Sequence, residues 1–187
     1  MSAATDATDA TDGAIDPEIF WLGAKFIIKD GRQVRIEFLS GHVAHLQGAR
    51  GKEHTVRFVC PNGSAFIYKG GRGRERRVRY ESSDKDVSFY VGPRGQERMV
   101  RYENSDGAVW FYKGPKGEER RVRCINPNGA VFDYKGRKCQ ERLARIKNPD
   151  GEVCFYRGPA GEEVLDRAFN PDGAAEYHDP DSVCACF

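Results

Sequence analysis

Long apolar runs are missing from this sequence of 187 residues. No stretch approaches the roughly 18 apolar residues of a transmembrane helix, so we expect no helix to span a membrane. The first residues, MSAATDATDATDGAID, combine neither a basic segment nor an apolar core, and we therefore expect no secretory signal. Helical periodicity with capping residues is also absent, which argues against a helical fold.

Cysteine and histidine are few, and they do not cluster. The four histidines include His42 and His45, which are three residues apart and so fall on opposite faces of a strand. We expect no shared metal site, no cofactor and no catalytic group of histidine, carboxylate and nucleophile, so we predict that the chain is not an enzyme. The cysteines do not recur at a fixed spacing, which indicates reduced thiols in an intracellular, cytoplasmic protein. They are Cys60, Cys124, Cys139, Cys154, Cys184 and Cys186.

Basic residues are missing from both ends of the chain. Residues 1–18 contain five acidic side chains and residues 171–187 contain four, with no Lys or Arg in either segment. Because the net charge of the whole chain is +2, residues 19–170 carry +11. A basic middle between acidic ends favours an acidic partner, or masking of the basic part by the chain's own tails.

What the sequence does contain is a repeat of 22 residues. The stretch Gly107 to Asn128 reads GAVWFYKGPKGEERRVRCINPN, and its pattern returns on both sides at that step. Such a period indicates a repeat architecture, in which each unit is one supersecondary element stacked on its neighbours. The recurring residues are Tyr68, Tyr90, Tyr112, Tyr134 and Tyr156; Gly48, Gly70, Gly92, Gly114, Gly136 and Gly158; Glu53, Glu75, Glu97, Glu119, Glu141 and Glu163; and Arg57, Arg79, Arg101, Arg123, Arg145 and Arg167.

Each repeat contains two short runs that read as strands, such as Ala108–Lys113 and Glu118–Ile125, bounded by Gly, Pro and Asn clusters. We predict an all-β fold, an elongated single-layer antiparallel meander of stacked β-hairpin repeats with about a dozen strands. The expected parts are a disordered acidic tail over residues 1–18, an N-terminal cap over 19–40, the hairpin array over 41–178 and an acidic, cysteine-containing tail over 179–187.

The alternation of a strand predicts which residues share a face. With a four-residue turn over Gly114–Gly117, Lys113 opposes Glu118 and Val109 opposes Val122. We then expect an apolar face and a polar face, and we expect the Glu and Arg columns of the polar face to neutralise each other as cross-strand pairs. The apolar face would carry Val109, Phe111 and Val122, and the polar face Tyr112, Glu119 and Arg123.

The repeat resembles that of the MORN family over roughly residues 41–178. The matching elements are Gly107, Tyr112-Lys113-Gly114, Gly117 and Asn128-Gly129, and again Gly151, Tyr156-Arg157-Gly158, Gly161 and Asp172-Gly173. The unit is slightly shorter than the family's, and E-R-x-V-R replaces its G-x-G second strand. The resemblance implies a single-layer hairpin array that serves as a scaffold for protein contacts or, in some members, for acidic lipid head groups.

Three functional hypotheses follow. The first is a non-catalytic repeat scaffold that mediates protein–protein interaction, with oligomerisation through the apolar face as a related expectation. The second is a scaffold on an anionic membrane, bound through the basic array and helped by C-terminal prenylation. The third is an enzyme whose site lies in the non-repetitive residues 19–45. Nucleic acid is a less favoured partner, because the Glu column is expected to neutralise the arginines.

The candidate binding surface consists of residues that recur with the repeat, together with one tryptophan: Tyr68, Tyr90, Tyr112, Tyr134, Tyr156, Arg79, Arg101, Arg123, Arg145 and Trp110. Specificity would come from positions that vary within the constant frame. These are Phe66, Trp110 and Phe132 on first strands, and Arg77, Met99, Arg121 and Leu143 on second strands.

The last four residues, Cys184-Ala185-Cys186-Phe187, fit the C-a-a-X pattern of prenylation at Cys184. Acidic residues stand where basic ones usually precede such a site. A C-x-C metal-binding pair is a second interpretation, although two ligands alone do not make a site. A cysteine-containing tail without either role is the third.

Overall fold

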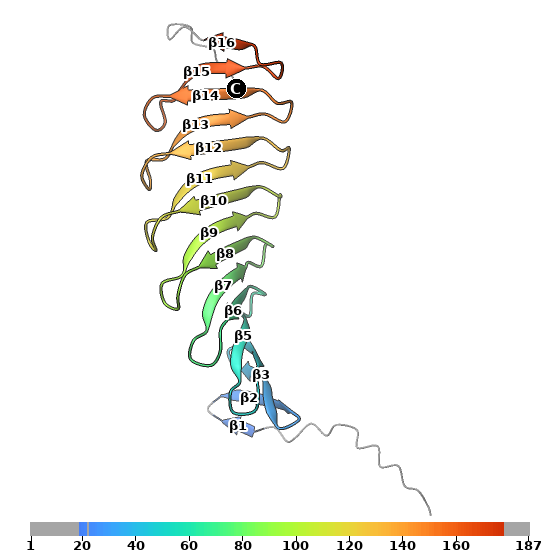
Figure 1. Ribbon diagram of the computed structural model, residues 1–187. Coiled ribbons are helices and arrows are strands. Elements are labelled where there is room, and N and C mark those ends of the chain that lie inside the picture. The colour runs from blue at the N-terminus through green and yellow to red at the C-terminus, as the bar shows by residue number, and fades with distance from the viewer. Residues whose placement is uncertain (1–18, 22, 178–187) are drawn as a thin grey trace, which may run out of the picture. The chain divides into compact units, whose positions relative to one another are not determined.

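The computed structural model describes residues 19–21 and 23–177, which form sixteen β-strands and no helix (Figure 1). The chain divides into two compact units after Glu75. The first unit contains β1 (Ile19–Trp21), β2 (Ala24–Lys29), β3 (Arg32–Phe38), β4 (Val43–Gln47), β5 (His54–Val59) and β6 (Ala65–Lys69). The second contains β7 (Arg76–Glu81), β8 (Val87–Val91), β9 (Arg98–Glu103), β10 (Val109–Lys113), β11 (Arg120–Ile125), β12 (Val131–Lys135), β13 (Arg142–Lys147), β14 (Val153–Arg157), β15 (Val164–Phe169) and β16 (Ala175–Tyr177).

Within each unit, every strand pairs antiparallel with the strands next to it in the chain. Figure 1 shows the strands of the second unit, β7 to β16, following one another in chain order as a single curved layer. The predicted all-β meander of stacked hairpins is therefore confirmed. The strands number sixteen rather than about a dozen, because residues 19–40 and the last repeat also form strands.

One end of the repeat closes with a short turn. In the repeat around Asn126, the Gly129 N–H donates to the Asn126 carbonyl at 2.8 Å, and the Asn126 N–H donates to the Ala130 carbonyl at 2.9 Å. Gly129 has a φ of 87°, so this is the three-residue hairpin loop whose last residue is left-handed. The Asn128 Oδ1 also accepts a hydrogen bond from the Ala130 N–H at 3.0 Å. The Asn-Pro-Asn-Gly sequence thus supplies both the backbone conformation and a side-chain acceptor.

The other end of the repeat is longer than the predicted four-residue turn. The last cross-strand pair is Lys113 with Arg120, so Gly114–Glu119 form a loop of six residues. Gly117, with a φ of 82°, has the positive φ that the third position of a type II turn requires. The loop includes the two glutamates because Gly114 brings the chain close to the backbone of Glu118.

The longer loop and a β-bulge make the predicted register wrong. Val122 is an extra residue in β11, so it does not oppose Val109, and neither Glu118 nor Glu119 opposes a strand residue. The same irregularity recurs in the hairpins β4–β5, β8–β9, β12–β13 and β14–β15, which close at the same kind of loop, and in β2–β3, which closes at the two-residue turn Asp30-Gly31. One inserted residue moves every side chain beyond it to the other face of the sheet. The observed pairs are Val109–Ile125, Trp110–Cys124, Phe111–Arg123, Tyr112–Arg121 and Lys113–Arg120.

The observed register therefore places Tyr112 and Arg123 on opposite faces. Arg123 shares its face with Phe111, whereas Tyr112 and Trp110 lie on the opposite face. The predicted polar face that combines Tyr112, Glu119 and Arg123 is wrong. We call the side of Phe111 and Arg123, with its equivalents in every repeat, the cationic face, and the side of Trp110 and Tyr112 the aromatic face.

The single layer encloses no large core. Among the described residues no large side chain is fully buried, and the buried apolar side chains are all alanine or cysteine. On the aromatic face, small residues lie in one row between large ones, as Ser88 lies between Tyr80 and Tyr102. The large neighbours cover the small residues, so each repeat buries apolar surface only against the repeats beside it. The buried members of this row are Ala44, Ser88, Cys124, Cys154 and Ala168.

Candidate functional site

The two faces of the second unit differ strongly in charge. Among its paired strand positions, the cationic face has twelve basic and three acidic side chains, a net charge of +9. The basic residues are Arg79, Arg98, Arg101, Lys113, Arg120, Arg123, Lys135, Arg142, Arg145, Lys147, Arg157 and Arg167, and the acidic ones are Glu81, Glu103 and Asp133. Counted in the same way, the aromatic face has one of each sign, Arg121 and Glu176.

Part of this charge opposes folding. Lys113 lies directly opposite Arg120, and Lys135 lies directly opposite Arg142. Like charges at directly opposed positions destabilise a sheet. Their recurrence in consecutive hairpins therefore points to a use of the positive charge other than stabilising the fold.

Five arginines at repeat spacing form what we call the arginine row: Arg79, Arg101, Arg123, Arg145 and Arg167. Most of them lie beside phenylalanine rings on the adjacent strands. The Cζ of Arg101 is 5.3 Å from the ring centroid of Phe89 and 5.8 Å from that of Phe111. The Cζ of Arg167 is 5.0 Å from the centroid of Phe155. These cation–π contacts restrict the guanidinium groups, since a phenylalanine ring lies between most successive arginines of the row.

Carboxylates neutralise the arginine row unevenly. Arg79 and Arg101 each pair with a glutamate two residues later on the same strand, at 3.0 Å and 2.5 Å. Arg123 and Arg145 share the single carboxylate of Asp133, at 2.7 Å and 3.4 Å. Arg167 makes no ion pair within residues 19–21 and 23–177. The three arginines nearest the C-terminal end thus have one carboxylate between them.

These arginines are accessible to a partner. The side chains of the four that form ion pairs, Arg79, Arg101, Arg123 and Arg145, are 38–49% exposed. The Nε atoms of Arg79 and Arg145 are shielded from solvent and have no hydrogen-bond partner. Exposed ion pairs of this kind contribute little to stability, so an external carboxylate or phosphate can compete with the internal ones.

The aromatic face presents a column of tyrosines. Each tyrosine pairs with an uncharged or arginine side chain on the next strand: Tyr90 with Met99, Tyr112 with Arg121, Tyr134 with Leu143 and Tyr156 with Leu165. The Cζ of Arg121 lies 4.1 Å from the centroid of Tyr134, and that of Arg77 lies 4.1 Å from the centroid of Tyr90. Burial raises the pKa of Tyr112 and of Tyr134, so both phenols stay neutral at physiological pH.

Trp110 lies in the row next to this column. It pairs with Tyr102 on one side and Cys124 on the other, and the rings of Trp110 and Tyr102 are 5.4 Å apart at 42°. The Tyr102 hydroxyl donates to Asp86 at 2.5 Å. Trp110 is only half-buried and therefore offers apolar surface to a partner.

The structure divides the predicted binding residues between the two faces. Tyr90, Tyr112, Tyr134, Tyr156 and Trp110 lie on the aromatic face, and Arg79, Arg101, Arg123 and Arg145 lie on the cationic face. The predicted variable positions of the second unit all lie on the aromatic face: Arg77, Met99, Trp110, Arg121, Phe132 and Leu143. Cys184 lies outside the described residues.

The recurring glutamates have a structural role that the sequence did not reveal. Three of them accept a hydrogen bond from a backbone N–H of the preceding repeat: Glu97 from Arg77 at 3.2 Å, Glu141 from Arg121 at 3.2 Å and Glu163 from Leu143 at 2.9 Å. Arg121 and Leu143 stand next to the bulge residues Val122 and Ala144. The predicted pairing of this Glu column with the arginines is therefore wrong, and the recurring glutamates do not neutralise the arginine row.

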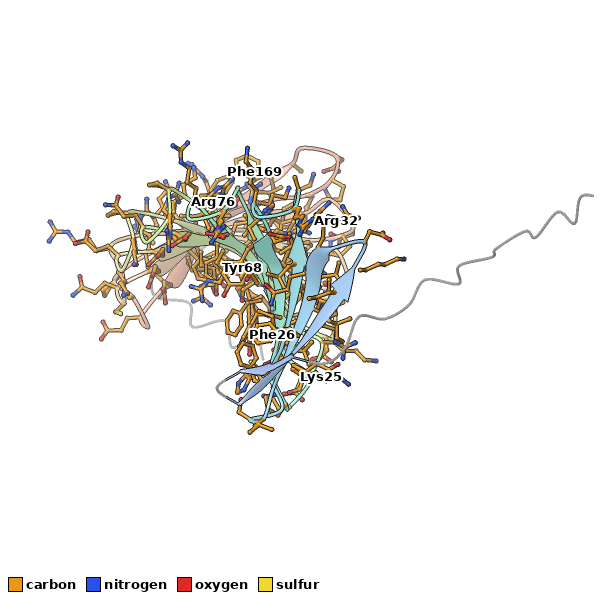
Figure 2. All side chains as sticks on the ribbon, turned by 90° about the horizontal axis from the view of Figure 1, so that it is seen from below. Lys25, Phe26, Arg32, Tyr68, Arg76 and Phe169 are labelled. Atoms are coloured by element: carbon orange, nitrogen blue, oxygen red, sulfur yellow. The ribbon has the colours of Figure 1, made fainter. Side chains whose placement is uncertain are left out.

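The first unit has the same two-faced design. In Figure 2, Lys25 and Arg32 lie on one side of its strands, and Phe26 and Tyr68 lie on the other. His45 lies on the cationic side between Arg35 and Arg57, and burial together with these two charges lowers its pKa. His42 instead stacks on Phe58 on the aromatic side, with centroids 5.3 Å apart. The prediction that the two histidines lie on opposite faces is confirmed.

Other kinds of site are not found in the described part of the chain. Residues 19–21 and 23–177 contain no group of three His, Cys, Asp or Glu side chains suited to a metal ion, and no helix that could cross a membrane. Their four cysteines form no disulfide. An open depression lies beside the turns of two successive repeats, between Gly92-Pro93 and Pro115-Lys116.

Comparisons with known proteins do not assign the chain to a family. No protein-family model matches it, and no curated protein matches it. The resemblance to the MORN repeats remains a prediction from the residues quoted above.

Proposed function

We propose that the chain is a non-catalytic scaffold that binds a protein partner through the aromatic face. The location of the variable positions carries this proposal. Two positions of the repeat vary, and the six residues that occupy them as named above lie on one face of the second unit, among tyrosines that do not change. Aromatic side chains are enriched in protein interfaces, because they bury a large area with few rotatable bonds. A constant frame with variable aromatic contacts suits a specific protein surface.

Photo-cross-linking from two neighbouring positions tests this proposal. A photoreactive phenylalanine analogue replaces either Trp110, on the aromatic face, or Phe111, its neighbour on the cationic face. We expect one discrete protein adduct from position 110 in an extract of the source cells, and none from position 111. Equal adducts from both positions, or none from either, would contradict binding through the aromatic face.

A second candidate function is attachment to an anionic membrane through the cationic face. The observation in its favour is the charge of +9 on one side of the second unit, including the directly opposed pair Lys113 and Arg120. Basic residues near an anionic leaflet contribute about 1 kcal/mol each, and salt screens the attraction. The resemblance to MORN repeats supports the same proposal.

Flotation with vesicles tests this second candidate. The chain is mixed with neutral vesicles or with vesicles that contain phosphoinositide, at low and moderate salt. Arg123→Gln and Arg121→Gln remove the same charge two residues apart on β11, from opposite faces. We expect only Arg123→Gln to weaken binding to anionic vesicles. An equal loss of vesicle binding in both variants, or binding that does not depend on salt, would argue against attachment through the cationic face.

A further inference from the structure

The arginine row has a regular spacing that constrains its ligand. Successive arginines of the row are separated by two strands, as Arg123 on β11 is from Arg145 on β13. Neighbouring strands lie about 4.7–4.9 Å apart, so the guanidinium groups recur about every 9.4–9.8 Å. A ligand that contacts several of them needs negative groups with the same period along its length.

The first residues of this chain have that period. Asp6, Asp9 and Asp12 follow one another at intervals of three residues in the sequence TDATDATD. A polyproline II segment has three residues per turn and rises about 3.1 Å per residue, so every third side chain lies on one side, about 9.3 Å from the next. Three aspartates would therefore meet three consecutive arginines with an accumulated mismatch of about 1 Å or less.

The distribution of carboxylates along the row indicates which three arginines are available to the aspartates. Arg79 and Arg101 already have a glutamate each, whereas Arg123 and Arg145 share Asp133 and Arg167 makes no ion pair among the described residues. Lys147, on the same face, adds a further positive charge beside them. The first unit offers a shorter row, because only Arg35 and Arg57 flank His45 there.

The length of chain decides between the same copy and a second copy. Residues 13–18 link Asp12 to β1 and span at most about 22 Å when fully extended. Arg123 and Arg167 lie on β11 and β15, four and eight strand spacings from β7, which is about 19 Å and 38 Å within the second unit alone. We take a second copy as the occupant, because its N-terminal segment can approach the row without the limit that this short link sets within one copy.

We propose that residues 1–18 of one copy bind the arginine row of a second copy, with Asp6, Asp9 and Asp12 paired to Arg123, Arg145 and Arg167. Such a contact is heterologous, since it joins different surfaces of two identical chains, and it links copies head to tail. Its strength depends on salt, because the pairs lie at the surface. The proposal is independent of the proposed function, because it needs neither a foreign protein nor a membrane.

A peptide-binding experiment on the full chain tests the proposal. The receptor is the full chain with Asp6→Asn, Asp9→Asn and Asp12→Asn, whose own segment cannot compete. The probe is a fluorescent peptide of residues 1–18, and the control peptide has Ala7 and Asp9 exchanged, which keeps composition and charge but breaks the period. We expect the native peptide to bind at least about threefold more tightly than the control, and its affinity to fall about tenfold or more between low and moderate salt. Equal binding of the two peptides would overturn the spacing argument.

Matched receptor variants locate the site. Arg167→Gln should weaken peptide binding by about two- to fivefold, the effect of one exposed ion pair. Arg121→Gln, which removes the same charge from the aromatic face, should leave binding unchanged. If Arg121→Gln weakens binding as much as Arg167→Gln, the assignment to the arginine row is wrong. Arg167→Lys keeps the charge and should retain most of the affinity.

Sedimentation of the unmodified chain completes the test. At low salt and at concentrations near the peptide's dissociation constant, we expect species larger than a monomer, which the triple Asp→Asn substitution removes. A wild-type chain that stays monomeric while the peptide binds would overturn the contact between copies, and would favour an intramolecular contact instead.

Discussion

The carboxylate of Glu163 accepts a hydrogen bond from the backbone N–H of Leu143 at 2.9 Å, across the boundary between two repeats. The other oxygen of the same carboxylate accepts from the Gly161 N–H at 2.9 Å, so one side chain fixes its own loop to the preceding hairpin. We predict that Glu163→Ala lowers the free energy of unfolding by about 1–2 kcal/mol, since it leaves a half-buried backbone donor without its charged acceptor.

Glu162→Ala is the matched control for this measurement, because Glu162 is the adjacent residue and its side chain is exposed. Urea denaturation followed by circular dichroism should show a clear decrease in midpoint for Glu163→Ala and almost none for Glu162→Ala. Similar midpoints for both variants would mean that water replaces the carboxylate at no cost.

The same glutamates make the stability of the folded chain depend on pH. The hydrogen bond from Leu143 holds the pKa of Glu163 below its ordinary value of 4.5, and a backbone hydrogen bond within its own residue does the same for Glu53. A carboxyl whose pKa is depressed by folding stabilises the native state above the unfolded pKa, and this contribution is lost as pH falls through the folded pKa. We predict a melting temperature that falls below pH 4.5, after an earlier decrease below pH 6.5 that comes from the lowered pKa of His45. Glu163→Gln should make the decrease shallower.

Composition, period and turn residues were enough to predict the fold class. The 22-residue step and the Gly, Pro and Asn clusters indicated stacked hairpins, and the structure confirms a single antiparallel layer. The register could not be predicted in the same way. Counting from a four-residue turn ignored Glu118 and Glu119, which remain in the loop, and the extra residue Val122, which forms a bulge. The two loop residues shift the register by two and leave the faces unchanged, whereas the single bulge residue exchanges the faces of Arg123 and its equivalents.

The candidate site was predicted in its residue types but not in its arrangement. The recurring tyrosines, arginines and Trp110 are accessible, yet they occupy two surfaces rather than one. The role of the Glu column could not be found from the sequence, because its partner is a backbone N–H twenty residues earlier. Every residue except proline has a backbone N–H, so the sequence does not mark which one donates.

Two glycines of one loop should respond differently to substitution. Gly114 has a φ of 128°, and a Cβ there would collide with the backbone oxygen of Glu118, whereas Gly117 has a φ of 82° and nothing within 4 Å. Gly117→Ala carries only the strain of a left-handed alanine, about 1–2 kcal/mol, while Gly114→Ala must also move the loop. We predict that Gly114→Ala lowers the melting temperature considerably more. Equal decreases would show that the loop relaxes freely around Gly114.

The last prediction concerns Tyr102, whose hydroxyl donates to the carboxylate of Asp86 at 2.5 Å. This hydrogen bond raises the pKa of Tyr102 to about 12, with smaller contributions from burial and from the negative charge of Asp86. Tyr102 therefore ionises at a higher pH in the folded protein than in the unfolded chain. The contact stabilises the folded protein below pH 10, and this contribution is lost as pH rises towards 12.

An NMR titration with labelled tyrosine rings can follow this group, and Tyr102→Phe assigns its resonance. We expect Asp86→Ala to return the pKa of Tyr102 towards 10, because the acceptor and the negative charge disappear together. Asp86→Asn keeps an acceptor but removes the charge, so the pKa of Tyr102 in this variant should lie between its values in the wild type and in Asp86→Ala. A pKa that stays near 12 in Asp86→Ala would show that burial, rather than Asp86, holds the proton on Tyr102.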